Sequence, residues 1–140
     1  MYDYQPPVTA TEIIYSSDEL LVVDKPAGLL TVPGRRPEHQ DCLITRLQVD
    51  YPDALLVHRL DMSTSGLLVF ARNSSSQRTL SRLFEQRQVG KTYLALVAGK
   101  MSSNAGRIEL PIGPDWPNRP RQKIDHANGR PAVTDYRLLD

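Results

Sequence analysis

The chain has 140 residues, of which 40% are hydrophobic and 24% charged. This length fits one domain, and the composition is that of a folded globular protein rather than a disordered one. No apolar run reaches the ~20 residues of a membrane-spanning helix, and residues 1–20 contain no lysine or arginine, so we expect a cytoplasmic protein without membrane contact. One cysteine and three histidines argue against a disulfide and a zinc site, and we expect no metal.

The net charge of +1 hides an uneven distribution. Residues 1–20 carry four acidic and no basic side chains, whereas residues 72–91 carry five basic and one acidic, a local net charge of +4. A second basic stretch lies near the C-terminus, at Arg119, Arg121, Lys123 and Arg130. On one face these stretches would attract a polyanion; a solvated helix and a solvated hairpin are the alternative.

After a short N-terminal tail, residues 1–11, the first predicted elements are strands. Glu12–Tyr15 and Leu20–Asp24 are apolar runs separated by turn residues. Lys25-Pro26-Ala27-Gly28 ends the second strand, because proline lacks an N–H and glycine permits a turn. Leu29–Val32 then resumes the extended pattern.

Two helices are predicted from capping and periodicity. After a polar, basic loop, Asp41 is a suitable N-cap for a helix from Cys42 to about Asp50, ended by Tyr51-Pro52. A longer helix begins near Asn73 or Ser74, since Ser74 and Gln77 have capping-box spacing. Its apolar residues at positions 80, 83 and 84 fall on one face.

The C-terminal part is predicted to contain strands. Lys91–Ala98 alternates with apolar residues on both faces, which indicates a strand buried on both sides. Arg107–Leu110 is a further short strand, and Arg121–Asp125 and Ala132–Leu139 flank Asn128-Gly129, a strong hairpin signal. Because strands and helices do not alternate strictly, we expect an α+β fold with a mixed, mainly antiparallel sheet and packed helices.

One polar stretch, His58 to Leu67, interrupts two apolar runs that we expect to be short strands, Leu55–Val57 and Leu67–Phe70. Polar residues at strand ends usually lie in loops, where binding and catalysis concentrate. In an extended backbone Arg59 and Asp61 project to the same side, so the guanidinium can pair with the carboxylate and keep it ionised. An ionised carboxylate suits a nucleophile better than a general acid.

Two other interpretations of this stretch stay open at this point. The first is structural: an ion pair between Arg59 and Asp61 that braces a turn between strands. The second is a hydrolase that uses His58, Asp61 and one of the serines at 63 and 65, although crowding in sequence does not supply the geometry of a catalytic triad.

Read together, residues 58–67 follow the pattern His-Arg-Leu-Asp-x-x-Thr-Ser-Gly-Leu, which resembles the catalytic signature of the RluA family of pseudouridine synthases. Residues 23–30 are similar to the family's Lys-Pro-x-Gly segment, and residues 91–99 are similar to a further strand motif of the family. The three motifs occur in the family's order. Pro33-Gly34-Arg35 and residues 115–120 resemble the member that modifies both large-subunit ribosomal RNA and the anticodon stem-loop of some transfer RNAs.

The resemblance implies a pseudouridine synthase fold and isomerisation of uridine to pseudouridine in RNA, without cofactor or metal. Asp61 would be the nucleophile, attacking either the uracil ring or the ribose C1′. Tyr93 would lie against the target base and help to remove a proton, and Arg59 would enter the space left by the flipped nucleotide. Unstacking a base costs a few kcal/mol, and an aromatic face and a planar guanidinium can replace the lost stacking.

The remaining residues singled out have supporting roles. His58, Thr64, Ser65 and Gly66 would support the loop. The candidate phosphate contacts are Arg35, Arg36, Arg119, Arg121 and Lys123, with a merely solvated side chain as the alternative for each. Such contacts position RNA without reading its sequence.

Members of the family are longer, and the Gly-Arg-x-His-Gln-x-Arg segment into which they continue has no match here. We therefore expect the N-terminal two-thirds of the fold, with a catalytic domain over residues 12–140 that is incomplete at its C-terminus. Unpaired strand edges would favour self-association. The alternative function is a noncatalytic RNA-binding fragment, inactive because the C-terminal wall of the cleft is absent.

Overall fold

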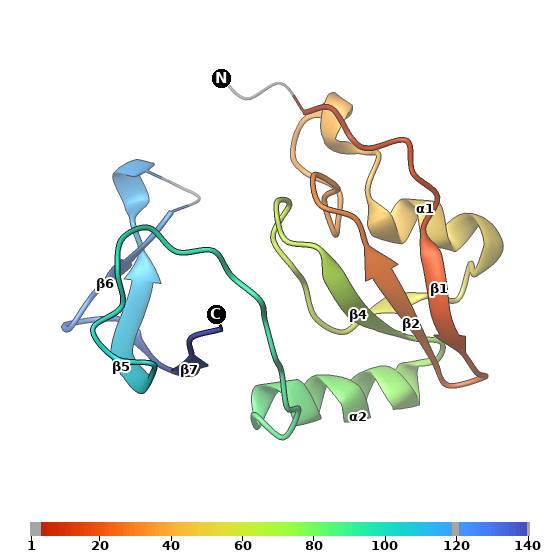
Figure 1. Cartoon of the computed structure of the whole chain (residues 1–140). Helices are drawn as coiled ribbons and strands as arrows, with labels where there is room; N and C mark the ends of the chain where they lie inside the picture. Colours follow the sequence, from red (N-terminus) through yellow and green to blue (C-terminus); the bar gives the residue numbers. More distant parts are fainter. Residues whose placement is uncertain (1–3, 119–120, 140) are drawn as a thin grey trace. The chain divides into compact units, whose positions relative to one another are not determined.

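The computed structural model describes residues 4–118 and 121–139, which form two compact units (Figure 1). Unit 1 spans Met1–Thr92 and unit 2 spans Tyr93–Asp140. Every strand pair in the described residues is antiparallel, and two α-helices belong to unit 1, so the predicted α+β class is confirmed. Within the described part of the chain, no helix is both long enough and apolar enough to cross a membrane.

Unit 1 is built on a four-stranded sheet in the order β1-β2-β4-β3, with strands at Glu12–Ser16, Leu20–Lys25, Gly66–Ala71 and Leu55–Leu56. A tight turn joins β1 to β2, where the Ser17 N–H donates to the Leu20 carbonyl at 3.0 Å. The Ser17 hydroxyl also accepts the Leu20 N–H at 3.2 Å. The strands predicted on both sides of this turn are confirmed.

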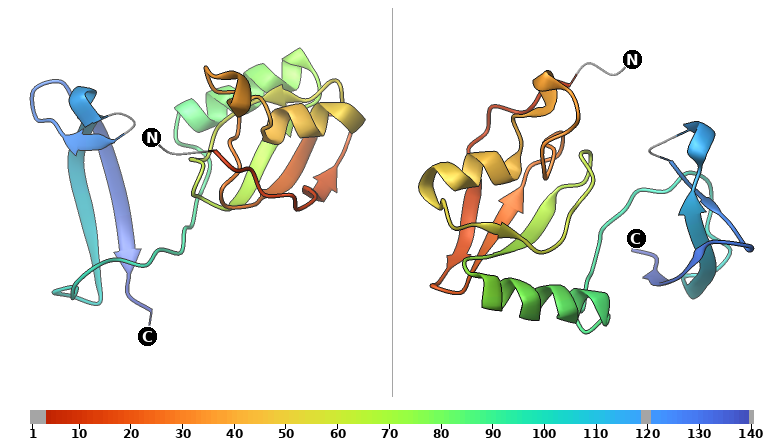
Figure 2. Two further views of the ribbon diagram at one scale, coloured as in Figure 1. Left: turned by 90° about the horizontal axis from the view of Figure 1, so that it is seen from above. Right: turned by 180° about the vertical axis from the view of Figure 1, so that it is seen from behind.

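The core of unit 1 lies between the sheet and α1, Leu43–Asp50 (Figure 2, right). The residues at its centre are fully buried: Leu21, Val23, Leu29, Leu43, Leu68 and Phe70. Alternate residues of β2 and β4 supply the sheet side of this cluster, as the period of a strand requires. Burying each such side chain stabilises the fold by about 1.5–3 kcal/mol.

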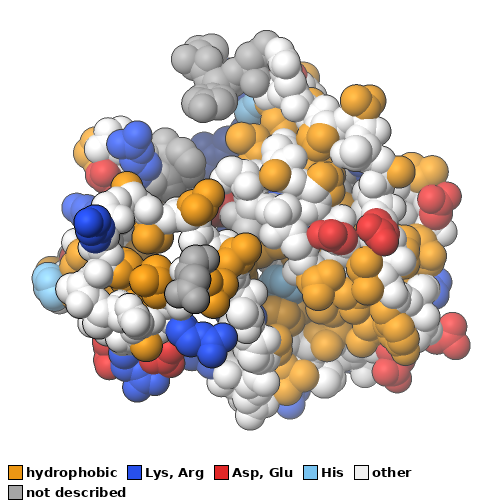
Figure 3. All heavy atoms as spheres, in the orientation of Figure 1, with side chains coloured by type: hydrophobic (Ala, Val, Ile, Leu, Met, Phe, Trp, Pro, Cys, Tyr) orange, Lys and Arg blue, Asp and Glu red, His pale blue; other side chains and the backbone are white. Residues whose placement is uncertain are grey.

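The opposite face of the same sheet is also apolar, and part of it is exposed. Val22 lies opposite Val69 in the ladder, and both side chains are half-buried. Leu67 is 61% exposed. Figure 3 shows apolar side chains gathered at the surface of this unit. Helix α2, Ser74–Glu85, packs against β4 and β3.

The capping contacts of both helices differ from the prediction, although α2 begins at Ser74 as expected. The N-cap of α1 is Cys42 and not Asp41, because the Cys42 N–H donates to the Thr45 hydroxyl at 3.1 Å. The Asp41 carboxylate instead pairs with Arg46, with Nε 2.6 Å from Oδ1. The predicted cap is therefore wrong by one residue.

The cap of α2 is Asn73, whose side chain accepts the Ser76 N–H at 2.8 Å. The capping box suggested by Ser74 and Gln77 is not formed. Gln77 instead donates from Nε2 to the Leu56 carbonyl at 2.8 Å, which ties the helix to β3.

Two predicted strands are absent. Leu29–Val32 does not join the sheet, because the carbonyls of Leu30 and Thr31 accept N–H groups from the start of α1. Lys91–Ala98 has no regular secondary structure, and Leu94 and Leu96 are 85% and 105% exposed. Alternating apolar residues favour a strand only where a neighbouring strand completes the ladder, and no described segment pairs with this one.

Unit 2 contains a three-stranded sheet in the order β6-β5-β7, with strands at Gln122–Ile124, Ala105–Pro114 and Arg130–Arg137. The expected hairpin around Asn128-Gly129 is wrong, since β6 and β7 lie on opposite sides of β5. The Asp125 carboxylate explains this: it accepts the N–H groups of Ala127 and Asn128 at 3.1 and 3.0 Å. The resulting wider turn carries the chain across the end of β5.

Candidate active-site loop

Asp61 lies in the loop between β3 and β4, and its side chain is exposed. The loop turns sharply at this residue, because the Thr64 N–H donates to the Asp61 carbonyl at 3.1 Å. Gly66, the first residue of β4, has a φ of +119°, a conformation that glycine adopts without strain. A carboxylate at an exposed turn with both flanking strands fixed is available to a ligand.

The residue before Asp61 is held by Thr31, which is only 4% exposed. The Thr31 hydroxyl donates to the Leu60 carbonyl at 2.7 Å and accepts the Leu60 N–H at 3.3 Å. A single side chain therefore satisfies both polar groups of the residue adjoining Asp61.

Met62, the residue after Asp61, is held by Gly28 and Lys25, which precede Thr31 in the chain. The Met62 carbonyl accepts the Gly28 N–H at 2.8 Å and the Lys25 ammonium at 3.1 Å. Lys25 is fully buried and also donates to the carbonyls of Pro26 and Leu29, at 3.0 and 2.7 Å. We call these contacts of Lys25, Gly28 and Thr31 with Leu60 and Met62 the 25–31 clamp.

The charge of Lys25 acts on the site as well as on the fold. Burial lowers the pKa of the Lys25 ammonium from its ordinary value, and the nearby Asp61 carboxylate opposes that shift. The ammonium and the carboxylate therefore attract one another. The sequence predicts Lys25 as the end of a strand and as part of the family's Lys-Pro-x-Gly segment, but not its contact with Met62. The available signal was a lysine at the end of a strand, immediately before proline.

His58 fixes the start of the loop. Its Nε2 accepts the Val69 N–H from β4 at 3.0 Å, so this nitrogen carries no proton. The imidazole stacks on the Phe84 ring of α2, with centroids 4.1 Å apart. Burial, and to a smaller extent the charge of Lys91, lowers the pKa of His58, which favours the neutral ring that this contact requires.

The predicted ion pair between Arg59 and Asp61 is wrong. Both side chains are exposed, and within the described residues no salt bridge joins them. The prediction assumed an extended backbone, whereas the chain turns at residues 61–64. Of the other loop residues, Thr64 is half-buried and Ser65 is exposed.

The other predicted site residues lie elsewhere in the chain. Tyr93 is the first residue of unit 2 and is 61% exposed. Arg35 and Arg36 are exposed beside a short 3₁₀ helix, Pro37–His39, where Arg36 approaches Glu38 to 3.7 Å. Arg121 and Lys123 are exposed in unit 2, and Arg119 lies outside the described residues.

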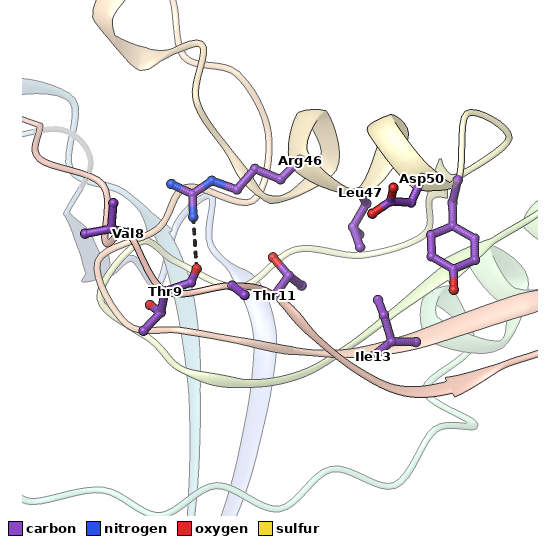
Figure 4. Close-up of a pocket in the computed structure, with 9 residues that line it drawn as sticks. Val8, Thr9, Thr11, Ile13, Arg46, Leu47 and Asp50 are labelled. Carbon is purple, nitrogen blue, oxygen red and sulfur yellow. Dashed lines mark hydrogen bonds between the residues drawn. The ribbon is translucent and has the colours of Figure 1, made fainter.

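A separate pocket of about 430 Å³ lies between the N-terminal segment and α1 (Figure 4). Its lining includes Thr11, Ile13, Leu47 and Tyr51, and no residue predicted for the active site contributes to it. Among the residues that the structure describes, no group of three or more His, Cys, Asp or Glu side chains is placed to hold a metal ion.

Comparison with known proteins settles the family. The family model for RNA pseudouridylate synthase matches residues 19–140, which include the whole of the Asp61 loop and the 25–31 clamp. The chain belongs to the RNA pseudouridylate synthase family. The resemblance read from residues 23–30, 58–67 and 91–99 is thus confirmed.

Two curated relatives of this chain carry the name dual-specificity RNA pseudouridine synthase RluA. The protein from Vibrio vulnificus (strain CMCP6) is 49% identical over 139 residues, covering 99% of this chain and 56% of the relative. The protein from Escherichia coli (strain K12) is 47% identical over 141 residues, covering 100% and 64%. The chain thus spans less than two-thirds of the length of these relatives.

Two solved human structures share the synthase fold. The RNA Pseudouridylate Synthase Domain Containing 1 protein is 30% identical, with a TM-score of 0.69 over 94% of this chain and 54% of that one. The Domain Containing 4 protein is 26% identical, with a TM-score of 0.72 over 91% and 53%. The predicted pseudouridine synthase fold is therefore confirmed for the part that this chain covers.

Proposed function

We propose that this chain carries the nucleophile-bearing part of an RNA pseudouridine synthase that isomerises uridines in structured RNA. The observation that supports this most is the placement of Asp61 at an exposed turn, with the peptides before and after it held by the 25–31 clamp. A nucleophile fixed in this way loses little motion on reaching the transition state. The names of the relatives favour RNA as the substrate. The resemblance of residues 33–35 and 115–120 favours ribosomal RNA, transfer RNA or both.

In the proposed reaction Asp61 attacks either the uracil ring or the ribose C1′. The bond between N1 and C1′ breaks, the uracil turns, and a bond forms between C5 and C1′. The bond from Asp61 to the uracil ring or to C1′ then breaks, which frees the carboxylate. The proton on C5 is lost and N1 gains one, so the product is an isomer and no cofactor is consumed. Tyr93 would lie against the base and assist the loss of that proton, as a positioned hydroxyl can.

The target nucleotide must leave its stack to reach Asp61. Arg59, which is exposed and forms no salt bridge within the described residues, would enter the space that the nucleotide leaves. The predicted phosphate contacts are Arg35, Arg36, Arg119, Arg121 and Lys123. His58, Thr64, Ser65 and Gly66 would hold the loop, and residues 12–140 would together contribute to one catalytic domain.

The test compares Asp61→Asn with wild type in the complete gene product that contains this chain. Tritium release from uridine-labelled stem-loop transcripts should fall at least about a thousandfold, while RNA affinity stays within about threefold. Asp50→Asn, which changes an exposed carboxylate at the end of α1, is the matched control and should react like wild type. Substantial turnover by Asp61→Asn would refute the nucleophile assignment.

The same experiment judges the alternative, a noncatalytic RNA-binding fragment. RNA binding by the 140-residue chain without tritium release, alongside release by a longer gene product, would favour that role for the chain alone. An RNA substrate also implies the cytoplasm as the site of action.

We also propose that the chain self-associates through unpaired strand-forming sequence. Leu94 and Leu96 of the unpaired 91–98 segment are largely exposed, and such sequences add to the edges of sheets. Sedimentation at high concentration should therefore show dimers or larger species. A single monomeric boundary would contradict this.

A further inference from the structure

The N-terminal segment, predicted as a tail, is bound to the loop that follows β2. The Tyr4 hydroxyl accepts the Leu30 N–H at 3.0 Å and donates to the Asp41 carbonyl at 2.8 Å. Its ring meets the His39 ring edge-on, with centroids 5.3 Å apart. Burial is the main cause of a raised pKa for Tyr4, so its hydroxyl stays protonated and able to donate.

One further hydrogen bond holds this segment, and Pro7 lies close to Gly28. Arg46 of α1 donates from Nη1 to the Thr9 carbonyl at 3.3 Å (Figure 4). A methyl group on Gly28 would come within 3.7 Å of Pro7, so the segment lies directly against the turn that contributes to the clamp. Residues 4–9 therefore cover the outside of the loop that holds Asp61.

Leu30, the partner of Tyr4, lies between two residues that act on the Asp61 loop. On one side the Leu29 carbonyl accepts the Lys25 ammonium at 2.7 Å. On the other side Thr31 binds both polar groups of Leu60. A shift of the Leu30 backbone would move both neighbours, because they share its peptide bonds.

We propose that Tyr4 is a positioning residue for Asp61, acting through Leu30 and the 25–31 clamp. Tyr4 touches neither the loop residue nor any reacting atom. Its hydroxyl fixes the backbone of residues 29–31 through the Leu30 N–H. Thr31 and Lys25 are thereby placed to hold the peptides on both sides of the Asp61 carboxylate. This inference rests on the proposed function of Asp61.

The test uses Tyr4→Phe in the complete gene product, which removes one oxygen atom and keeps the ring. Amide hydrogen exchange at Leu30 and Leu60 should accelerate about fivefold, since one hydrogen bond is lost at Leu30 and the clamp loosens at Leu60. The kcat for tritium release, per folded enzyme, should fall about five- to tenfold while KM for RNA changes less than twofold. Tyr15→Phe, at an exposed tyrosine of β1, is the matched control and should leave the exchange rates, kcat and KM unchanged.

Thr31→Val supplies a second variant that removes the hydroxyl of the clamp itself. Tyr4→Phe should lower kcat much less in a Thr31→Val background than in wild type, because both changes weaken the same device. The inference is overturned if Tyr4→Phe leaves Leu60 exchange and kcat at wild-type values, or lowers thermal stability alone. Absence of tritium release from the wild type would instead refute the proposed function. Amide hydrogen exchange at Leu60 in Tyr4→Phe would then still show whether Tyr4 fixes the loop.

Discussion

The His58 and Phe84 rings stack with an interplanar angle of 19°, which joins the first residue of the Asp61 loop to α2. The same imidazole accepts the Val69 N–H from β4. One neutral histidine therefore connects a loop, a strand and a helix, and its protonation state matters for all three.

Stability should fall as the pH drops below the ordinary pKa of His58. Folding lowers this pKa from 6.5, so between 6.5 and the folded value the unfolded chain binds more protons and the folded state loses stability. Chemical denaturation at pH 7.5, 6.5 and 5.5 should show a decline over this window. In His58→Gln the free energy of unfolding should fall less over this pH range. The same substitution at exposed His126 should give the same fall as wild type.

Replacing Lys25 with methionine should destabilise unit 1 by about 1–3 kcal/mol, because the Leu29 and Met62 carbonyls lose a buried donor. The folded-state pKa of Lys25 is lowered, so between that value and 10.5 the unfolded chain binds more protons and wild-type stability gains from rising pH. Lys25→Met should lack this gain. Circular dichroism during urea denaturation at pH 7.5 and 9.5 measures both effects, and exposed Lys100→Met is the control.

Asn73→Ala should destabilise α2 by about 1 kcal/mol, since it removes the side chain that accepts the Ser76 N–H. Ser74→Ala should leave the stability of α2 unchanged or raise it by a few tenths of a kcal/mol, although sequence spacing suggested this serine as a cap. Hydrogen exchange in the first turn of α2 separates the two variants. Equal acceleration by both would contradict the cap seen in the structure.

Gly129→Ala should disrupt the turn between β6 and β7. An added Cβ would lie 2.3 Å from the Asp125 carbonyl oxygen, and that backbone atom cannot move without breaking the turn. We expect a loss of about 2 kcal/mol or more in the stability of unit 2. Gly90→Ala is the control, because a Cβ there meets nothing within 4 Å. A melting temperature of Gly129→Ala equal to that of wild type would contradict the close approach of Gly129 to the Asp125 carbonyl.

The sequence predicted what depends on local pattern. Apolar runs bounded by turn or polar residues located β1, β2 and β4, and the polar interruption at residues 58–67 located the loop of Asp61. It failed where neighbouring side chains compete for the same main-chain groups. Thr45 rather than Asp41 completes the cap of α1, and Asp125 turns the chain away from the hairpin that Asn128-Gly129 suggested.

The 25–31 clamp could not be predicted because nearly every contact in it joins a side chain to a main-chain atom about 30 residues or more away. The spacing of residues in the sequence does not indicate such distant pairs. The roles of Tyr93, Arg59 and the predicted phosphate contacts stay predictions from the family resemblance.

The clamp holds backbone atoms of Leu60 and Met62 and leaves their side chains out of the bonding. The backbone around Asp61 is therefore positioned through main-chain atoms, although the Leu60 side chain also packs against the core. A substitution of the Met62 side chain can therefore leave every hydrogen bond of the clamp in place.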